Sequence, residues 1–406
     1  MLPPDADAVV VRWGELYTKS DPVRQRMTRR LADNLRAVLA DRDLPGSVAA
    51  RSGRLLVETG QPDPVADAAS EVPGVVSASP AAVVEPTRDA IRDALAAAAS
   101  EHYDGGTFAV DANRAYGGLP FTSEDVGRFG GDAVYEAAEA RGHDPEVDLD
   151  DPDLTFGVDC RRERAYVFLE RREGPGGLPV GSQAPLVALV SGGIDSPVAA
   201  FEAMRRGSPV VPVYLDLGEF GGPDHRARAE ASMATLAARA PDHVTEGLVV
   251  PAGDTVEHLA ASVDQGRMLA FRRFCLLVAA AVAAERGCAG IVTGEALGQK
   301  SSQTAANLRV TDAAVELPVH RPLLTVDKPD ITERARALGT FDDATVPVGC
   351  QAFAPDQPAT AATVERVEEL EPGDLAERAQ AAAADAEGLV LGQETRRDSA
   401  RSRSGS

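Results

Sequence analysis

Residues 186–200 of the chain read LVALVSGGIDSPVAA, and this stretch predicts the fold of the second half. Its first five residues are apolar and uncharged, which is typical of a strand covered on both faces of a parallel sheet. Gly192 and Gly193 form the turn that follows, where glycine can adopt a positive φ and allow close backbone approach. We expect Ser196 to cap the next helix and Pro197 to be its first residue. Such a helix start offers N–H groups and a positive dipole end to an anion.

A glycine pair after a strand is also common in ordinary strand–helix turns. The evidence for a phosphate-binding loop is therefore the complete Ser-Gly-Gly-x-Asp-Ser string. The Walker A pattern is absent from the sequence, which disfavours a kinase or a GTPase. The hydroxyls of Ser191 and Ser196 can donate to a phosphate group. The carboxylate of Asp195 can hold Mg²⁺ between phosphates.

The pattern continues on the C-terminal side of this motif. Short apolar runs lie at 210–215, 247–251 and 290–293, and helical stretches lie at 197–206, 224–239 and 267–286. Alternating strands and helices predict an α/β fold with a doubly wound parallel sheet, which binds ligands at the carboxyl ends of its strands. On the N-terminal side, a segment rich in glycine and proline at 174–185 is typical of a linker. Before it, strands and helices alternate in a way that predicts two small α+β domains.

Composition narrows the class of protein. The chain has 406 residues, of which 44% are hydrophobic and 26% charged, as in soluble globular proteins. It contains no apolar run of the roughly 18 residues that a membrane span needs, and its N-terminus does not resemble a secretory signal. Four cysteines without a CxxC pair are too few for a disulfide scaffold. We therefore expect a cytoplasmic, enzyme-like protein with no membrane partner.

The charge of the chain is unusual. Asp and Glu number 63 against 41 Lys and Arg, which gives a net charge of -22, and lysine occurs only at positions 19, 300 and 328. This acidic, lysine-poor composition resembles that of proteins from salt-loving organisms. It disfavours a nucleic-acid partner, because binding to phosphates needs positive charge. A local arginine patch would still permit one.

The Ser-Gly-Gly-x-Asp-Ser string resembles the PP-loop of ATP pyrophosphatases, which split ATP into AMP and pyrophosphate while adenylating a substrate. Three later segments, IVTGEALGQKSSQTAANL at 291–308, HRPLLTVDKPDI at 320–331 and GCQAFAP at 349–355, resemble the tRNA 4-thiouridine synthetase (tRNA uracil 4-sulfurtransferase) family. In the N-terminal half, RWGEL at 12–16 resembles the opening strand of that family. The segment FAVDANR at 108–114 resembles its THUMP domain, an RNA-binding module.

The resemblance, together with the Gly/Pro-rich linker and the Ala- and Glu-rich composition after residue 370, predicts a domain organisation. It consists of a ferredoxin-like domain at 1–75, a THUMP domain at 76–173, the linker at 174–185, a PP-loop domain at 186–370 and a disordered tail at 371–406. It also implies a reaction in which ATP adenylates O4 of uridine 8 in tRNA. A cysteine persulfide, or sulfide, then replaces the activated oxygen, since ionised sulfur is a strong nucleophile. A link to thiamine biosynthesis is left open.

By the same resemblance, Cys350 would carry the persulfide, Lys328 would assist adenylation, and Asp195 would support the PP-loop chemistry with Mg²⁺. Without the family motifs, a surface lysine at a helix start is the alternative interpretation of Lys328, although so few lysines favour a catalytic one. Arg272 alone is better interpreted as a solvated helix residue and Cys350 alone as an incidental loop thiol. The implied ATP contacts are Leu189, Val190, Ser191, Gly192, Gly193, Asp195, Ser196, Tyr214, Leu215, Arg272, Gly294 and Gln303.

Some features depart from the family. Many relatives carry Asp-Cys-Cys where this chain has Val348, Gly349 and Cys350, which leaves one thiol. Met268 and Phe271 occupy the positions of a CxxC pair in relatives with an iron–sulfur cluster, so no cluster is expected. A rhodanese extension is not expected either. Sulfur is therefore expected from a separate donor, which is a desulfurase, a carrier protein or free sulfide.

The THUMP-like zone contains arginines that are candidates for contact with RNA phosphates, although each alone is also typical of a solvated surface. They are Arg114, Arg128, Arg161 and Arg162. Tyr116 and Phe121 are expected to pack in the core instead of stacking on RNA. Two alternative functions remain, a PP-loop ligase that adenylates a small molecule and a non-catalytic THUMP protein that binds RNA. The sequence does not decide whether the chain forms a homodimer.

Overall fold

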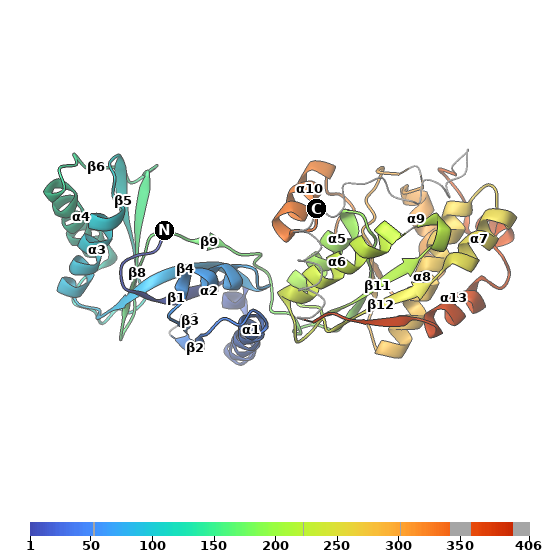
Figure 1. Ribbon diagram of the computed structural model, residues 1–406, viewed down its shortest axis with the longest axis horizontal. Coiled ribbons are helices and arrows are strands. Elements are labelled where there is room, and N and C mark those ends of the chain that lie inside the picture. Colours follow the sequence, from blue (N-terminus) through green and yellow to red (C-terminus); the bar gives the residue numbers. More distant parts are fainter. Residues whose placement is uncertain (52, 222, 301, 342–358, 393–406) are drawn as a thin grey trace. The chain divides into compact units, whose positions relative to one another are not determined.

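The structure is a computed structural model that describes residues 1–392, except for 52, 222, 301 and 342–358 (Figure 1). It divides into two compact units, Met1–Leu178 and Pro179–Ser406. The division falls inside the glycine- and proline-rich segment that the sequence analysis interprets as a linker. Among the described residues, no helix combines the length and the apolar character needed to cross a membrane.

The first unit is built on one nine-stranded sheet. Its strand order is β2 (Ser47–Arg51), β3 (Arg54–Glu58), β1 (Ala6–Trp13), β4 (Val75–Val84), β8 (Ala165–Phe168), β7 (Leu154–Cys160), β5 (Thr107–Arg114) and β6 (Glu146–Val147), with β9 (Arg172–Glu173) also paired to β4. Strand β4 pairs with β1 along most of its length and with β8 at its end. The predicted domain boundary at 75/76 therefore falls in a strand that the two halves of the sheet share.

Helices pack on this sheet where alternate strand residues present apolar side chains. Along β1, Val9 and Val11 pack against α1 (Asp21–Asp41) and α2 (Pro62–Ser70), whereas Ala8 and Val10 point to the opposite face. A second apolar cluster joins β5 and β7 to α3 (Arg88–His102) and α4 (Ser123–Ala140). A short 3-10 helix, η1 (Glu15–Thr18), follows β1.

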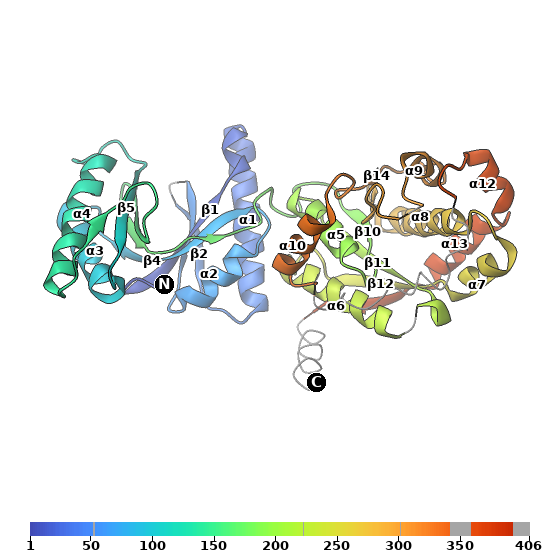
Figure 2. The same cartoon turned by 90° about the horizontal axis from the view of Figure 1, so that it is seen from above.

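The second unit contains a six-stranded sheet in the order β14 (Val319–His320), β13 (Ile291–Val292), β10 (Leu186–Leu189), β11 (Val210–Asp216), β12 (Glu246–Pro251) and β15 (Glu387–Val390). All neighbours are parallel except β12 and β15. Helices α5 (Asp195–Arg205), α6 (Pro223–Arg239) and α10 (Lys328–Leu338) contribute to the core on one face (Figures 1 and 2). Helices α7 (Gly253–Ser262), α8 (Arg267–Arg286) and α13 (Leu375–Ala384) contribute to the core on the other. The predicted parallel, doubly wound sheet is confirmed.

The described part of this unit also contains three shorter helices. They are η2 (Gly218–Phe220), α9 (Ala305–Asp312) and α12 (Val364–Leu370). Leu269 of α8, Val310 of α9 and Val367 of α12 form a small separate apolar cluster.

The prediction of a disordered tail from residue 371 is corrected for its described part. Leu375 and Ala379 of α13 are buried in the same core as α8, and β15 adds an antiparallel edge strand to β12. The alanine- and glutamate-rich composition that suggested disorder is that of an amphipathic helix whose apolar side packs on a neighbour. Residues 393–406 lie outside the described part of the chain.

Candidate active site

The phosphate loop joins the buried strand β10 to helix α5. The helix begins at Asp195 after Ile194, which makes no side-chain capping hydrogen bond, so the predicted start at Pro197 is two residues late. The Ser196 hydroxyl instead accepts a hydrogen bond from the Ser191 backbone N–H at 2.7 Å and lies 3.0 Å from the Ser191 hydroxyl. The two serines therefore close the loop at the helix start, where the first N–H groups of α5 have no partner within the helix.

The glycines of this region allow close packing and do not supply a special φ. Neither Gly192 nor Gly193 is among the described glycines with positive φ, which corrects that expectation. A Cβ at Gly192 would lie 3.0 Å from the backbone oxygen of His225. A Cβ at Gly294 would lie 2.7 Å from the backbone nitrogen of Ser196. Gly294, a predicted ATP contact, is thus packed directly on the first turn of α5.

Gly294→Ala is expected to displace the phosphate loop, because its new Cβ would meet backbone atoms of Asp195 and Ser196 that cannot rotate away. Overpacking of this kind costs about 1–3 kcal/mol. We expect a lower free energy of unfolding in denaturant titrations and at least about tenfold weaker ATP binding by calorimetry. Gly373→Ala is the matched control, since nothing lies within 4 Å of its Cβ position. Equal ATP affinity in the two variants would contradict the packing argument.

Two of the predicted catalytic residues meet at this loop. Lys328 is the first residue of α10 and Asp195 the first residue of α5, and the Lys328 Nζ donates to Asp195 Oδ1 at 2.6 Å. Their side chains are 49% and 27% exposed, so a ligand can reach both. The arrangement places a mobile cation and a carboxylate at the entrance of an anion-binding helix start.

Arg272 and Gln303, two further predicted ATP contacts, carry polar atoms without partners. Arg272 lies on α8, and its guanidinium donates to the carboxylate of Glu295. Its Nε and the side-chain oxygen of the buried Gln303 have no hydrogen-bond partner among the described residues. Buried polar groups without partners are uncommon unless a ligand or water completes them. The Arg272 guanidinium, the helix start and Lys328 offer donors and positive charge to a polyphosphate nucleotide, which would supply the leaving group for adenylation. The Gln303 oxygen is an acceptor, so it suits an amino or hydroxyl group of such a ligand.

The predicted apolar walls lie at the ends of β10 and β11. Leu189 pairs with Val213 in the parallel register, and the Val190 backbone N–H continues this pairing by donating to the Val213 oxygen at 2.8 Å. Tyr214 and Leu215 are both buried, but they belong to cores on opposite faces of the sheet. Successive strand residues point in opposite directions, so the side chains of these two residues cannot form one wall.

Two of the described cysteines, Cys160 and Cys288, are poor candidates for the sulfur carrier. Cys160 is buried, and burial raises its pKa to about 11. Burial also raises the pKa of the Cys288 thiol. Both thiols are therefore protonated at neutral pH and weakly nucleophilic. The predicted carrier, Cys350, lies outside the described residues.

The predicted RNA contacts occupy different environments. Arg128 is largely exposed and lies 3.8 Å from Asp125. Arg114 donates weakly, at 3.4 Å, to backbone oxygens of the following turn. Arg161 is buried and donates to Asp159 at 2.7 Å, so its positive charge is compensated by this carboxylate inside the first unit.

One aromatic expectation is also corrected. Phe121 is buried as predicted, but Tyr116 is 39% exposed, and the Arg162 guanidinium lies over its ring at 5.8 Å from the centroid. Both residues lie in the connection between β5 and α4, but Phe121 packs against Phe129 of α4, whereas Tyr116 remains at the surface. Tyr116 and Arg162 thus form an exposed pair.

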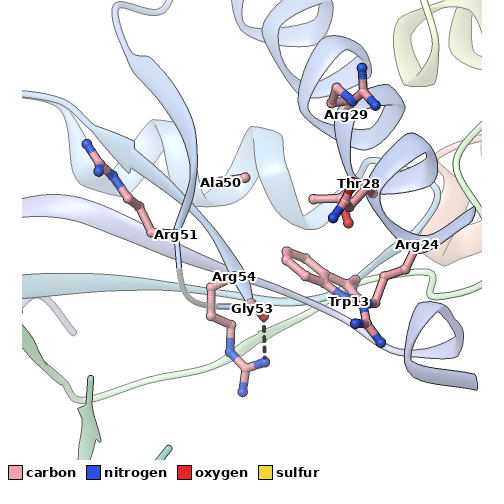
Figure 3. A pocket seen from close by; sticks show the side chains of 9 residues that line it. Trp13, Arg24, Thr28, Arg29, Ala50, Arg51, Gly53 and Arg54 are labelled. Atoms are coloured by element: carbon pink, nitrogen blue, oxygen red, sulfur yellow. Dashed lines mark hydrogen bonds between the residues drawn. The ribbon is translucent and has the colours of Figure 1, made fainter. Parts of the chain in front are cut away.

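The ferredoxin-like part holds an arginine-lined pocket that sequence reasoning missed. Its volume is 740 Å³, and its lining residues are Trp13, Arg24, Gln25, Thr28, Arg29, Ala50, Arg51, Gly53 and Arg54 (Figure 3). The arginines come from α1 and from the β2–β3 hairpin, on either side of Trp13. Arg29 and Arg51 are exposed, and neither has an ion-pair partner among the described residues. In a chain with net charge -22 this is a local positive site.

A parallel sheet with an anion-binding strand–loop–helix, together with a lysine and an aspartate at its mouth, defines a PP-loop enzyme that acts on nucleotides. Three protein families match parts of the chain. They are "Thiamine biosynthesis protein (ThiI)" over residues 181–373, "THUMP domain" over 85–170 and "ThiI ferredoxin-like domain" over 8–79.

Similar proteins extend over almost the whole chain. A "Probable tRNA sulfurtransferase" of Halobacterium salinarum is 60% identical over 95% of this chain and 98% of its own length. One of Methanosarcina acetivorans is 39% identical over 87% of this chain and 86% of its own. A crystal structure of a 4-thiouridine synthetase–RNA complex with bound ATP aligns with a TM-score of 0.81 at 27% identity, covering 95% of this chain and 99% of that one. The chain belongs to the tRNA sulfurtransferase (ThiI) family of enzymes.

Proposed function

We propose that this chain transfers sulfur to tRNA and forms 4-thiouridine at position 8, with ATP split into AMP and pyrophosphate. The observation that carries the proposal is the Lys328–Asp195 pair at the mouth of the phosphate loop. Family membership and the solved relative with RNA and ATP support it. We place the reaction in the cytoplasm, where tRNA is the substrate.

The first step is activation of the uridine carbonyl. The N–H groups at the start of α5 and the hydroxyls of Ser191 and Ser196 hold phosphate oxygens. Lys328 turns from Asp195 to the phosphates. The Asp195 carboxylate would then be one of the groups that hold Mg²⁺, and that ion would supply positive charge to compensate the phosphates. The Lys328 ammonium then stabilises the negative charge that grows as uridine O4 attacks the α-phosphorus and pyrophosphate leaves.

The second step replaces the activated oxygen by sulfur. The terminal sulfur of a persulfide on Cys350 attacks C4, and AMP leaves with the former O4. The resulting disulfide between Cys350 and the base sulfur needs two electrons from an external dithiol to release 4-thiouridine. Free sulfide would bypass this reduction, since it attacks C4 without forming a disulfide. In either case the sulfur comes from a separate donor.

The tRNA is held by the first unit. Arg114, Arg128 and the Arg162–Tyr116 pair offer guanidinium donors and an aromatic ring in the THUMP-like part. The arginine-lined pocket adds the exposed guanidinium groups of Arg29 and Arg51 on the ferredoxin-like part. Guanidinium groups match phosphate oxygens in geometry and in charge. These local sites offset the repulsion between the acidic chain and RNA.

The double variant Arg29→Gln with Arg51→Gln is expected to weaken tRNA binding and flatten its salt dependence. Two lost phosphate contacts should reduce the slope of log affinity against log salt by about 2. Filter binding across a salt series measures the slope. The control is Arg366→Gln with Arg378→Gln, which removes two surface arginines that pair with Glu369 and Asp374. If both double variants change the slope equally, net charge alone and no local site governs binding.

Pyrophosphate release separates the proposed function from its two alternatives. Release from ATP that depends on unmodified tRNA supports the proposal. Release driven by a small acid or amide without tRNA supports a PP-loop ligase. Binding of tRNA with no pyrophosphate release under any condition supports a non-catalytic RNA-binding protein.

A further inference from the structure

Glu295 is a buried carboxylate that receives two arginines. The Arg272 guanidinium of α8 donates to one of its oxygens, and the Arg321 Nε donates to the other at 2.7 Å. The Thr293 hydroxyl lies 3.1 Å from the second oxygen. Burial acts to raise the pKa of Glu295, but the charges of Arg272 and Arg321 outweigh burial and lower the pKa below its ordinary value. The carboxylate is therefore ionised at neutral pH.

The two arginines are held to different degrees. Arg321 also makes two hydrogen bonds to Asp312, at 2.5 and 3.1 Å, so both its sides are fixed. Arg272 donates to Glu295, and its buried Nε has no hydrogen-bond partner in the described part of the chain. The Arg272 side chain is still 19% exposed, so a ligand can reach part of its guanidinium. Its orientation depends on Glu295 much more than that of Arg321 does.

The same segment is fixed against the phosphate loop. Gly294, directly before Glu295, packs so closely on α5 that a Cβ there would approach the Asp195 and Ser196 backbone. Glu295 is therefore the next residue in the chain after a glycine that packs directly on the phosphate loop. Glu295 and Arg321 also belong to the two separate motifs at 291–308 and 320–331, and their ion pair joins those motifs in space.

We propose that Glu295 is a positioning residue that aims the Arg272 guanidinium at the phosphates of ATP. An ionised carboxylate would repel those phosphates directly, so Glu295 acts through Arg272 and does not touch the nucleotide. This inference rests on the proposed function, because it assigns ATP to the site beside the phosphate loop. Arg272 and Glu295 then act as one unit, and the loss of either has the effect of losing both.

The test is a double-mutant cycle of Glu295→Gln and Arg272→Gln, with pyrophosphate release measured at saturating tRNA and sulfide. Glu295→Gln keeps the shape of the side chain and removes its charge. We expect its KM for ATP to rise about tenfold, the effect of one charge-assisted hydrogen bond, with kcat changed less than about threefold. In the Arg272→Gln background the same change is expected to add almost nothing. Asp312→Asn, which loosens only the far side of Arg321, is the control and should keep the KM of the wild type.

Folding is followed by denaturant titration, since a buried arginine left without its carboxylate destabilises the chain. If Glu295→Gln does not fold, Glu295→Asp keeps the charge but retracts it by one methylene, and the same rise in KM is expected. Additive effects of the two substitutions, or an unchanged KM in a folded Glu295 variant, would overturn the inference. An inactive wild-type chain that binds no ATP would instead refute the proposed function.

Discussion

Lys328→Met is expected to slow tRNA-dependent pyrophosphate release about 10²–10³-fold, the usual cost of removing one charge that stabilises a transition state. The side chain keeps its length but loses the ammonium that lies 2.6 Å from Asp195 at the phosphate loop. The decrease should be in kcat more than in the affinity for tRNA, because the arginines that we propose to contact RNA are on the other unit. Single-turnover assays with labelled ATP measure the step directly.

Two variants control for the loss of charge. Lys19→Met makes the same substitution far along the chain from the loop and should leave pyrophosphate release unchanged. Lys328→Arg keeps the charge but replaces a compact ammonium by a planar group, and it should restore only part of the rate. Full activity of Lys328→Met would show that the lysine is a surface residue at a helix start.

Cys350→Ser is expected to abolish thiolation from a persulfide donor, with a loss of more than about 10³-fold, while tRNA-dependent pyrophosphate release continues. A serine hydroxyl cannot carry a sulfane sulfur, but adenylation does not use this side chain. The two readouts are 4-thiouridine in digested tRNA and released pyrophosphate, measured in the same reaction. With free sulfide in place of the persulfide donor, part of the thiolation should return.

The other cysteines provide the comparison. Cys288→Ser replaces a buried thiol whose pKa is raised by burial, and its thiolation rate should stay close to that of the wild type wherever the variant folds. Parallel loss of pyrophosphate release and thiolation in Cys350→Ser would show that this cysteine supports the fold or the first step. Normal thiolation in Cys350→Ser would assign the carrier role elsewhere.

The sequence predicted the second unit well because its signals are local. Strands β10 to β13 are short apolar runs between turn residues, and each is followed by a helix. Strand β14, which contains His320, was not predicted. Asp195 and Lys328 were both assigned to the reaction by resemblance to the family, without a prediction that they touch. Their ion pair in the structure is therefore a new observation.

What the sequence did not predict depends on contacts between distant segments. Nothing in residues 75–84 indicates that β4 pairs with both β1 and β8, and β15 is a strand only because the edge of β12 is available. The Glu295–Arg321 pair and the arginine-lined pocket likewise join segments that are apart in sequence. Arg161 was predicted at the surface, yet its position beside Asp159 buries it.

The measurement that tests the central claim most directly is the formation of 4-thiouridine in a tRNA transcript incubated with the chain, ATP, Mg²⁺ and sulfide. We predict one 4-thiouridine per transcript, located at position 8 by mass spectrometry of nuclease fragments, and none in a transcript with cytidine at that position. An ATP-consuming reaction that leaves position 8 unmodified in the uridine transcript would contradict the assignment of sulfur transfer to this chain.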